Sequence, residues 1–176
     1  MKYFASLLFA VVATFQIHAG AQQMTASFVM NPVGDFKAKT SAIKGSATQQ
    51  GDTVHAENIV IDVSTLATGL DLRDKHAKEK YLEMAKYPQI VLVKADGKGG
   101  KGQGILKLHG VEHPVSGTYV VKGNMLTADF TIKLSDFKIA EINYKGVGVE
   151  DEAKISVTVP LTAAAAPAAA AAKKTK

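Results

Sequence analysis

The sequence predicts an all-β protein of about eight antiparallel strands with one short α-helix, folded as a sandwich or as a closed up-and-down β-barrel. Apolar and polar residues alternate in several segments, most clearly in NMLTADFTIKL at 124–134. Short glycine-containing turns separate such segments, as at Lys122-Gly123-Asn124. A single segment departs from this alternation and has helical spacing instead. Closure into a barrel would remove the exposed strand edges that promote aggregation.

The predicted strands follow one another along most of the chain. Each shows either alternation or a short apolar run bounded by turn residues. Alternation places Leu126, Phe130 and Ile132 on one face of their strand, and Ile155 and Val157 on one face of theirs. The predicted strands are 25–30, 35–47, 54–63, 89–94, 105–109, 115–121, 124–134 and 153–160.

One helix is predicted over residues 73–84. Ala77, Tyr81 and Met84 recur there at helical spacing, and Pro88 prevents the helix from continuing. Because this segment interrupts the succession of strands, we expect the helix to plug one end of a barrel.

A polar cluster opens this helix and consists of Asp71, Arg73, Asp74 and His76. Paired carboxylates beside a histidine are one arrangement used in acid–base catalysis. The same residues also fit a structural role, because Asp74 can cap or support the helix start. Arg73 can bind carboxylates or strand-end carbonyl groups where the helix meets the barrel mouth. We favour the structural role and predict no catalytic residue.

The two ends of the chain differ from its middle. Residues 1–21 contain Lys2, an apolar run and the triplet Ala-Gly-Ala, which together predict a cleavable signal peptide and therefore a periplasmic or secreted protein. Residues 22–161 form the predicted folded domain. Residues 162–176, TAAAAPAAAAAKKTK, carry no large apolar side chain and predict a disordered tail.

The charge argues against a nucleic-acid partner. The formal net charge is +5, but Lys2 and the three lysines of the tail account for most of it, so the folded domain is near neutral. A weak contact of the lysine tail with a membrane surface or with cell-wall polymer remains open. The oligomeric state is also open, and a homodimer is one alternative.

Other motifs predict no catalytic, cofactor or metal site. The segment GKGGKG at 97–102 matches a dinucleotide-binding pattern, but a strand rather than a helix follows it, so we interpret it as a flexible hairpin loop. The absence of cysteine excludes disulfides and thiolate metal sites, and no serine lies in a nucleophile-elbow pattern. The spacing of the histidines in the predicted folded domain predicts no metal site; they are His55, His76, His109 and His113.

Several segments resemble the YceI-like, lipid- and polyisoprenoid-binding family. The strongest is TLATGLDLRDKHAKEKYLEMAKYPQIVL at 65–92, where a strand ends in a Thr-Gly turn, an Arg-Asp-x-His motif opens the helix and Tyr-Pro returns the chain to the sheet. The segments at 31–48 and 104–119 are similar to the family's opening strands and its Gly-Val-x-x-Pro-Val hairpin. The segments at 132–139 and 146–159 are similar to its closing strands.

This resemblance implies an eight-stranded, lipocalin-like antiparallel β-barrel whose apolar interior holds an isoprenoid or similar lipid tail. We therefore predict a non-enzymatic carrier or sequestering protein for an isoprenoid or fatty-acyl lipid. About ten enclosed carbons would contribute roughly 8 kcal/mol before ordering costs. The candidate lining residues are the inward-facing Phe36, Ile59, Ile61, Tyr119, Leu126, Phe130, Ile132, Ile155 and Val157.

Two other hypotheses stay open at this point. In the first, the barrel is packed solid with its own side chains and acts as an envelope stress or adhesion module without a lipid. In the second, the Asp71 to His76 cluster is catalytic, and replacing His76 with alanine would abolish an activity while leaving the fold intact.

Overall fold

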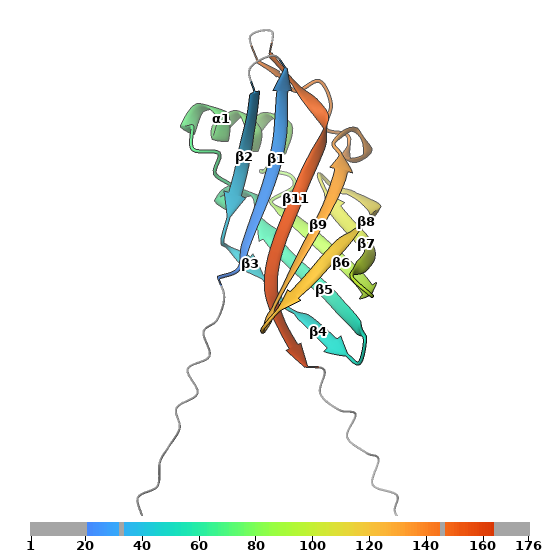
Figure 1. Cartoon of the computed structure of the whole chain (residues 1–176). Helices are drawn as coiled ribbons and strands as arrows, with labels where there is room; N and C mark the ends of the chain where they lie inside the picture. The colour runs from blue at the N-terminus through green and yellow to red at the C-terminus, as the bar shows by residue number, and fades with distance from the viewer. Residues whose placement is uncertain (1–20, 32–33, 145–146, 164–176) are drawn as a thin grey trace, which may run out of the picture.

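A computed structural model describes residues 21–31, 34–144 and 147–163 and confirms the all-β fold (Figure 1). The predicted signal peptide, 1–21, lies outside these residues except for its last residue. The predicted tail, 162–176, lies outside them from residue 164 onward, and its first two residues belong to the last strand instead. The strands are β1 (Gln23–Asn31), β2 (Gly34–Thr40), β3 (Ile43–Lys44), β4 (Ala47–Gln50), β5 (Thr53–Asp62), β6 (Gln89–Lys98), β7 (Lys101–Leu108), β8 (Val111–Lys122), β9 (Met125–Lys133), β10 (Asn143–Tyr144) and β11 (Val147–Ala163). The helical segments are η1 (Val63–Thr65), α1 (Asp71–His76), η2 (Ala77–Tyr81) and η3 (Ser135–Phe137).

The strands close into a barrel because the long strand β11 has neighbours on both edges. On one edge it pairs with β9 over residues 152–160. On the other edge it pairs first with β1, over residues 148–158, and then with β4, over residues 161–163. The closed ring is therefore β11, β4, β5, β6, β7, β8 and β9, and β1 and β2 extend from the upper part of β11.

Among the described residues, all strand pairs are antiparallel except that between β11 and β4, which is parallel. The sequence predicted antiparallel pairing throughout, and this junction is the exception. It arises because β11 is seventeen residues long and continues past the start of β1, where Leu161 pairs with Ala47. The parallel pair thus completes the ring at the end of the barrel where both β1 begins and β11 ends.

The predicted strand at 35–47 is divided by a corner. The hydroxyl of Thr40 accepts a hydrogen bond from the Ala42 N–H at 3.0 Å, which turns the chain after β2. Gly45 follows with a φ of 114°, a conformation that side chains disfavour. The corner allows β2 to pair with β1 while β3 and β4 pair with β5.

The glycine-rich segment at 97–102 is a hairpin, as predicted, but its turn is short. Only Gly99 and Gly100 lie in the turn, with φ values of 61° and 81°. Gly97 and Gly102 are paired with each other and belong to β6 and β7. The barrel wall therefore continues almost to the end of this hairpin.

The helix formed by α1 and η2 lies beside β2 at one end of the barrel (Figure 1). The helix was predicted over 73–84, but α1 covers only 71–76 and the wider π-turn of η2 continues it to Tyr81. Glu83 then has a φ of 43° and ends the helical conformation. No helix in the described ranges is long and apolar enough to span a membrane.

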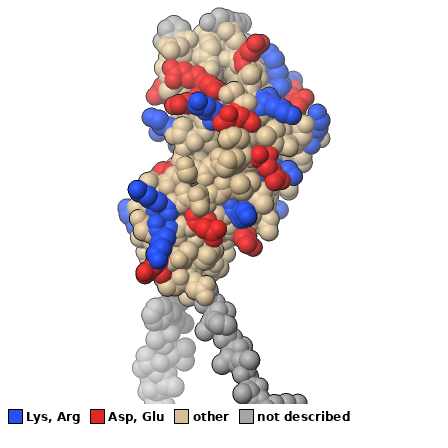
Figure 2. Space-filling model, turned by 90° about the vertical axis from the view of Figure 1, so that its right-hand side faces the viewer, with Lys and Arg blue, Asp and Glu red and all other residues tan. Residues whose placement is uncertain are grey.

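Charged groups of both signs are interspersed on the face of the domain in Figure 2. Lysines and arginines lie next to aspartates and glutamates there, and uncharged surface separates the groups. This distribution agrees with the near-neutral charge expected for the folded domain.

Candidate functional site

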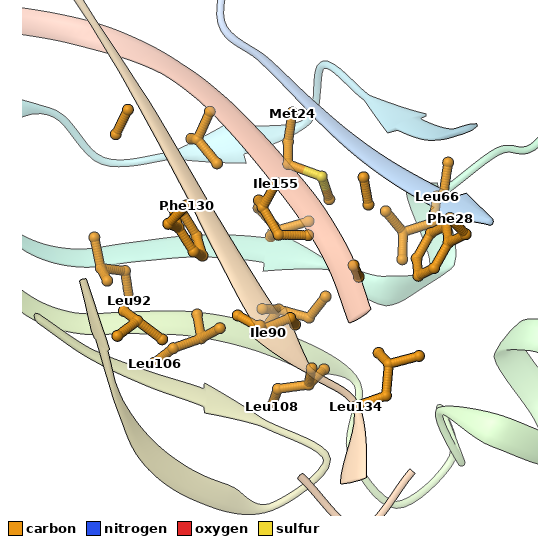
Figure 3. Close-up of a pocket in the computed structure, with 18 of the residues that line it drawn as sticks. Met24, Phe28, Leu66, Ile90, Leu92, Leu106, Leu108, Phe130, Leu134 and Ile155 are labelled. Atoms are coloured by element: carbon orange, nitrogen blue, oxygen red, sulfur yellow. The ribbon is translucent and has the colours of Figure 1, made fainter. Parts of the chain in front are cut away.

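The barrel encloses a long apolar cavity of about 720 Å³. Its wall comes from nearly every strand of the barrel and from the helical segment. In Figure 3 most of the labelled side chains, among them Phe28, Leu92 and Ile155, come from strands on different sides of the cavity and point toward one another. Apart from the sulfur of Met24, the side chains drawn there are hydrocarbon. Many of the inward-facing residues are only partly buried because they border this empty space.

The structure brings the candidate lining residues together on the cavity wall. They come from β2, β5, β8, β9 and β11, and β9 pairs with both β8 and β11. Their role in binding a ligand stays a prediction. The residues are Phe36, Ile59, Ile61, Tyr119, Leu126, Phe130, Ile132, Ile155 and Val157.

Much of the wall was missing from the sequence-based set. The apolar run IVLV in β6 does not alternate, so its inward face could not be assigned, and a bulge between Leu92 and Lys94 shifts the register within it. A second register shift, between Phe28 and Met30, affects β1. The lining residues that were missed include Met24, Phe28, Leu66, Ile90, Leu92, Leu106 and Leu108.

A tyrosine packs against bare backbone at the β6–β7 hairpin end of the cavity. The ring of Tyr119 lies so close to Gly97 that a Cβ there would be 2.6 Å from its Cε1 atom. The same Cβ would be 2.9 Å from a methyl group of Val54. Gly97 thus provides the room that the Tyr119 ring occupies, and all three residues border the cavity.

The polar cluster of Asp71, Arg73, Asp74 and His76 lies at the opposite end of the cavity. The Arg73 guanidinium donates to the Thr68 hydroxyl and to the Thr68 carbonyl oxygen, both at 2.9 Å. Asp74 accepts hydrogen bonds from the Thr68 N–H at 2.8 Å and from the Thr68 hydroxyl. Thr68 is thereby held by two residues of α1, which fixes the loop before the helix to the helix itself.

These contacts differ in part from the expected roles. Asp74 accepts its hydrogen bonds from Thr68 in the loop before α1 and not from the first turn of the helix, and Leu70 at the N-cap position makes no side-chain capping bond. Arg73 binds a carbonyl group, as expected, but that carbonyl belongs to a loop rather than to a strand end. Asp71 and His76 also border this end of the cavity.

Arg73 is stacked on an aromatic pair. Its guanidinium carbon lies 4.3 Å from the ring centre of Phe36, and Phe36 in turn stacks on Phe28 with ring centres 4.9 Å apart. Phe28 and Phe36 face each other across the β1–β2 pair. The polar cluster is therefore continuous with the apolar wall.

The remaining histidines form separate pairs. His55 contacts Asp96 at 2.6 Å, and His109 contacts Glu83 at 2.9 Å and the Phe137 carbonyl oxygen at 3.0 Å. Across the described ranges, no group of three or more potential metal ligands forms. His109 thus joins the β7–β8 turn to the segment after η2 and to η3.

The comparisons with known proteins give a family and a fold. The family profile of the YceI-like domain matches residues 12–161. No curated protein matches the chain. Among solved structures, BcnA of Burkholderia cenocepacia is similar at 18% identity with a TM-score of 0.58, covering 77% of this chain and 94% of that one.

Two further structures share the fold. A polyisoprenoid-binding domain from Saccharophagus degradans has 14% identity and a TM-score of 0.58, covering 81% of this chain and 94% of its own. A mutant YceI protein of Campylobacter jejuni with a monobromobimane guest has 15% identity and a TM-score of 0.50, covering 70% of this chain and 83% of its own. At these identities the similarity establishes the barrel architecture.

Proposed function

The chain belongs to the YceI-like family, and on this premise we propose that it is a periplasmic carrier or sequestering protein that holds the apolar chain of a lipid in its barrel. The ligand class is a polyisoprenoid or a fatty-acyl lipid. One solved relative in fold is described as a polyisoprenoid-binding domain, which supports this class. The proposal includes no catalytic step and no nucleic-acid partner.

The cavity carries the proposal. Its volume of about 720 Å³ falls within the usual range of about 300–1,000 Å³ for small-molecule sites. Each methylene group that leaves water for such a wall contributes about 0.8 kcal/mol, so a chain of about ten enclosed carbons gains roughly 8 kcal/mol before ordering costs. A hydrocarbon chain therefore needs no polar anchor to bind here.

The same cavity contradicts the hypothesis of a barrel packed solid with its own side chains. Residues such as Leu92, Phe130 and Ile155 point inward yet leave space between them (Figure 3). Well-packed interiors leave few voids larger than a water molecule. An envelope function that depends on a filled barrel is thus not supported.

The hypothesis of catalysis by the helix-start cluster has little structural support. Arg73 and Asp74 both bind Thr68, so the hydrogen bonds of these two groups hold a loop in place. The proposal gives this cluster a positioning role. Replacing His76 with alanine is accordingly expected to leave the ligand capacity of the barrel intact.

The periplasmic location is supported by the sequence of residues 1–21, with its lysine, apolar run and small-residue triplet. A weak contact of the lysine-ended tail with anionic membrane or cell-wall polymer would keep the protein near its source of lipid. Both points belong to the proposal, and N-terminal sequencing of the protein from a periplasmic fraction tests the first.

The test of the function is to purify the protein from the exporting cell, record its mass under native conditions, and identify any ligand by organic extraction and mass spectrometry. The proposal predicts a mass increment that extracts as a lipid. A protein without bound lipid that also fails to take up added isoprenoid or fatty-acyl chains would contradict it.

A further inference from the structure

We propose that the groove between β2 and residues 67–73 binds the oxyanion head group, a carboxylate or a phosphate, of the lipid whose chain fills the cavity. This inference rests on the proposed function and specifies the chemistry of its ligand. It concerns a second hollow, of about 430 Å³, on the outer side of the barrel wall.

The groove and the cavity share a wall. Phe36, Thr68 and Arg73 line both of them, so one layer of side chains separates the apolar interior from the groove. The sheet is also weakest here. Beyond the Lys39–Ala67 bridge, no strand among the described residues pairs with the outer edge of β2. A ligand with its chain inside can therefore place its head outside at this edge.

Arg73 has hydrogen-bonding capacity to spare. A guanidinium has five N–H donors, and the contacts to Thr68 are made by Nε and one terminal nitrogen. Within the described ranges, Arg73 forms no ion pair with any carboxylate. The two contacts and the stacking on Phe36 fix the plane of the guanidinium, and the unused N–H groups match the paired oxygens of a carboxylate or phosphate.

The charge of the groove favours an anion. Lys37 and Lys39 alternate with inward-facing residues along β2, so both are exposed on its outer side, next to the groove. Together with Arg73 they give the lining three cationic side chains against the single carboxylate of Asp35. Asp71 and Asp74 border the cavity but not the groove, and Asp74 accepts hydrogen bonds from Thr68.

The aromatic stack connects the two compartments. Phe28 points into the cavity in Figure 3, Phe36 stacks on it, and Arg73 lies over Phe36. An amphiphile would therefore meet hydrocarbon, then an aromatic surface, then a cation along one path. This order matches the order of groups in a fatty acid or a prenyl phosphate, in which the anion terminates the chain.

The test compares ligands that differ only in their head groups. Displacement of a fluorescent fatty-chain probe from the purified protein measures the affinities of hexadecanoate and hexadecanol, and of geranylgeranyl phosphate and geranylgeraniol. At low salt we expect at least one oxyanion to bind about tenfold more tightly than its alcohol, because charge-assisted hydrogen bonds are the stronger ones. The preferred pair distinguishes a carboxylate from a phosphate.

Substitutions in the groove show whether its cationic side chains cause the preference for an oxyanion. Lys37→Gln combined with Lys39→Gln should lower the oxyanion preference severalfold, and Arg73→Lys should also lower it. The matched control is Lys98→Gln combined with Lys101→Gln, which removes two exposed lysines at the β6–β7 hairpin and should not alter the preference. Because the Lys37 and Lys39 side chains are exposed, their replacement should not disturb folding.

Equal affinity for oxyanion and alcohol in both pairs would overturn the inference and leave the proposed function standing. A preference that persists unchanged in the Lys37, Lys39 and Arg73 variants would overturn the location of the site. Failure of all four ligands to displace the probe would instead contradict the proposed function itself.

Discussion

The wall formed by β5 to β9 and the edge of β2 are built in opposite ways. Along the wall, adjacent strands pair over long ladders, as between β5 and β6 from Thr53–Lys98 to Asp62–Gln89. At the outer edge of β2, the one pairing among the described residues joins Lys39 and Ala67, through two hydrogen bonds of 2.8 and 2.9 Å. The rest of this boundary includes side-chain contacts among Phe36, Thr68 and Arg73, and a hydrogen bond of 2.8 Å between the hydroxyls of Thr40 and Thr65.

This difference suggests how a closed barrel can exchange a large apolar ligand. Opening the wall would break many backbone hydrogen bonds. Opening the β2 edge would break only the two backbone hydrogen bonds between Lys39 and Ala67. Polar side chains also gather at this edge, where Lys37, Lys39 and Arg73 line the groove. We therefore interpret the β2 edge as the exchange point and the wall as the rigid container.

Hydrogen exchange should show the largest contrast between the two regions. Amides of β6 are expected to open with free energies close to that of global unfolding, and the amide of Lys39, which donates to the Ala67 carbonyl oxygen, with a free energy lower by several kcal/mol. Mass spectrometry of peptides covering residues 36–41 and 89–95 measures both. Equal protection of the two peptides would remove the basis for a distinct exchange point.

Replacing a phenylalanine in each of the two regions should affect stability and ligand binding differently. Phe137 is 1% exposed in the core beside the wall, so Phe137→Ala is expected to lower the free energy of unfolding by about 3–5 kcal/mol. Phe36→Ala at the β2 edge should cost less stability, because Phe36 is only partly buried, but it should weaken ligand binding. Chemical denaturation and probe displacement measure the two effects, and the reverse pattern would contradict the assignment.

A methyl group at Gly97 tests the packing at the β6–β7 hairpin end of the cavity. In Gly97→Ala the new Cβ would meet the Tyr119 ring, so we expect a loss of about 1–3 kcal/mol in the free energy of unfolding. Gly148→Ala is the matched control, because no atom lies within 4 Å of a Cβ there. If both variants unfold at the same denaturant concentration, the tyrosine does not depend on the glycine for its position.

The smallest effect concerns the loop that follows β9. The Ser135 hydroxyl and N–H donate to Asp151 at 2.6 and 2.7 Å and hold the pKa of its carboxyl below the ordinary value of 3.8. Because the pKa is lowered by folding, this contribution to stability is present above pH 3.8 and is lost as the pH falls further. Asp151→Asn should slightly lower Tm at neutral pH and flatten the change in Tm with pH below 3.8. A variant with the wild-type acid profile would exclude this role.

The sequence predicted the parts of the fold that depend on local patterns. Alternation placed Leu126, Phe130 and Ile132 on one face of β9, and the structure has them on the cavity wall. The corner after Thr40 and the parallel pairing of Leu161 with Ala47 could not be predicted in the same way. Both depend on contacts between segments that are distant in the sequence, and a hydrophobic pattern does not specify such pairing.

In the candidate site, too, contacts between distant segments could not be predicted from the sequence. The cluster at Arg73 and Asp74 was recognisable from its residue types, and Thr68 belongs to the Thr-Gly turn of the family resemblance. Nothing in the sequence indicated that Thr68 is the hydrogen-bond partner of both residues. The stacking of Arg73 on Phe36 joins residues far apart in the sequence. Their proximity follows from the path of β2 beside α1, which only the three-dimensional structure gives.

The central claim is that the barrel holds an apolar chain. It is tested most directly by a substitution that fills the cavity with a larger side chain. Ala128 borders the cavity on β9, and Thr131 on the same strand is exposed. Native mass spectrometry with added geranylgeraniol should detect a bound chain in the wild-type protein and in Thr131→Trp, and little or none in Ala128→Trp. Uptake by Ala128→Trp equal to that of the wild type, or no uptake by the wild type, would contradict the account.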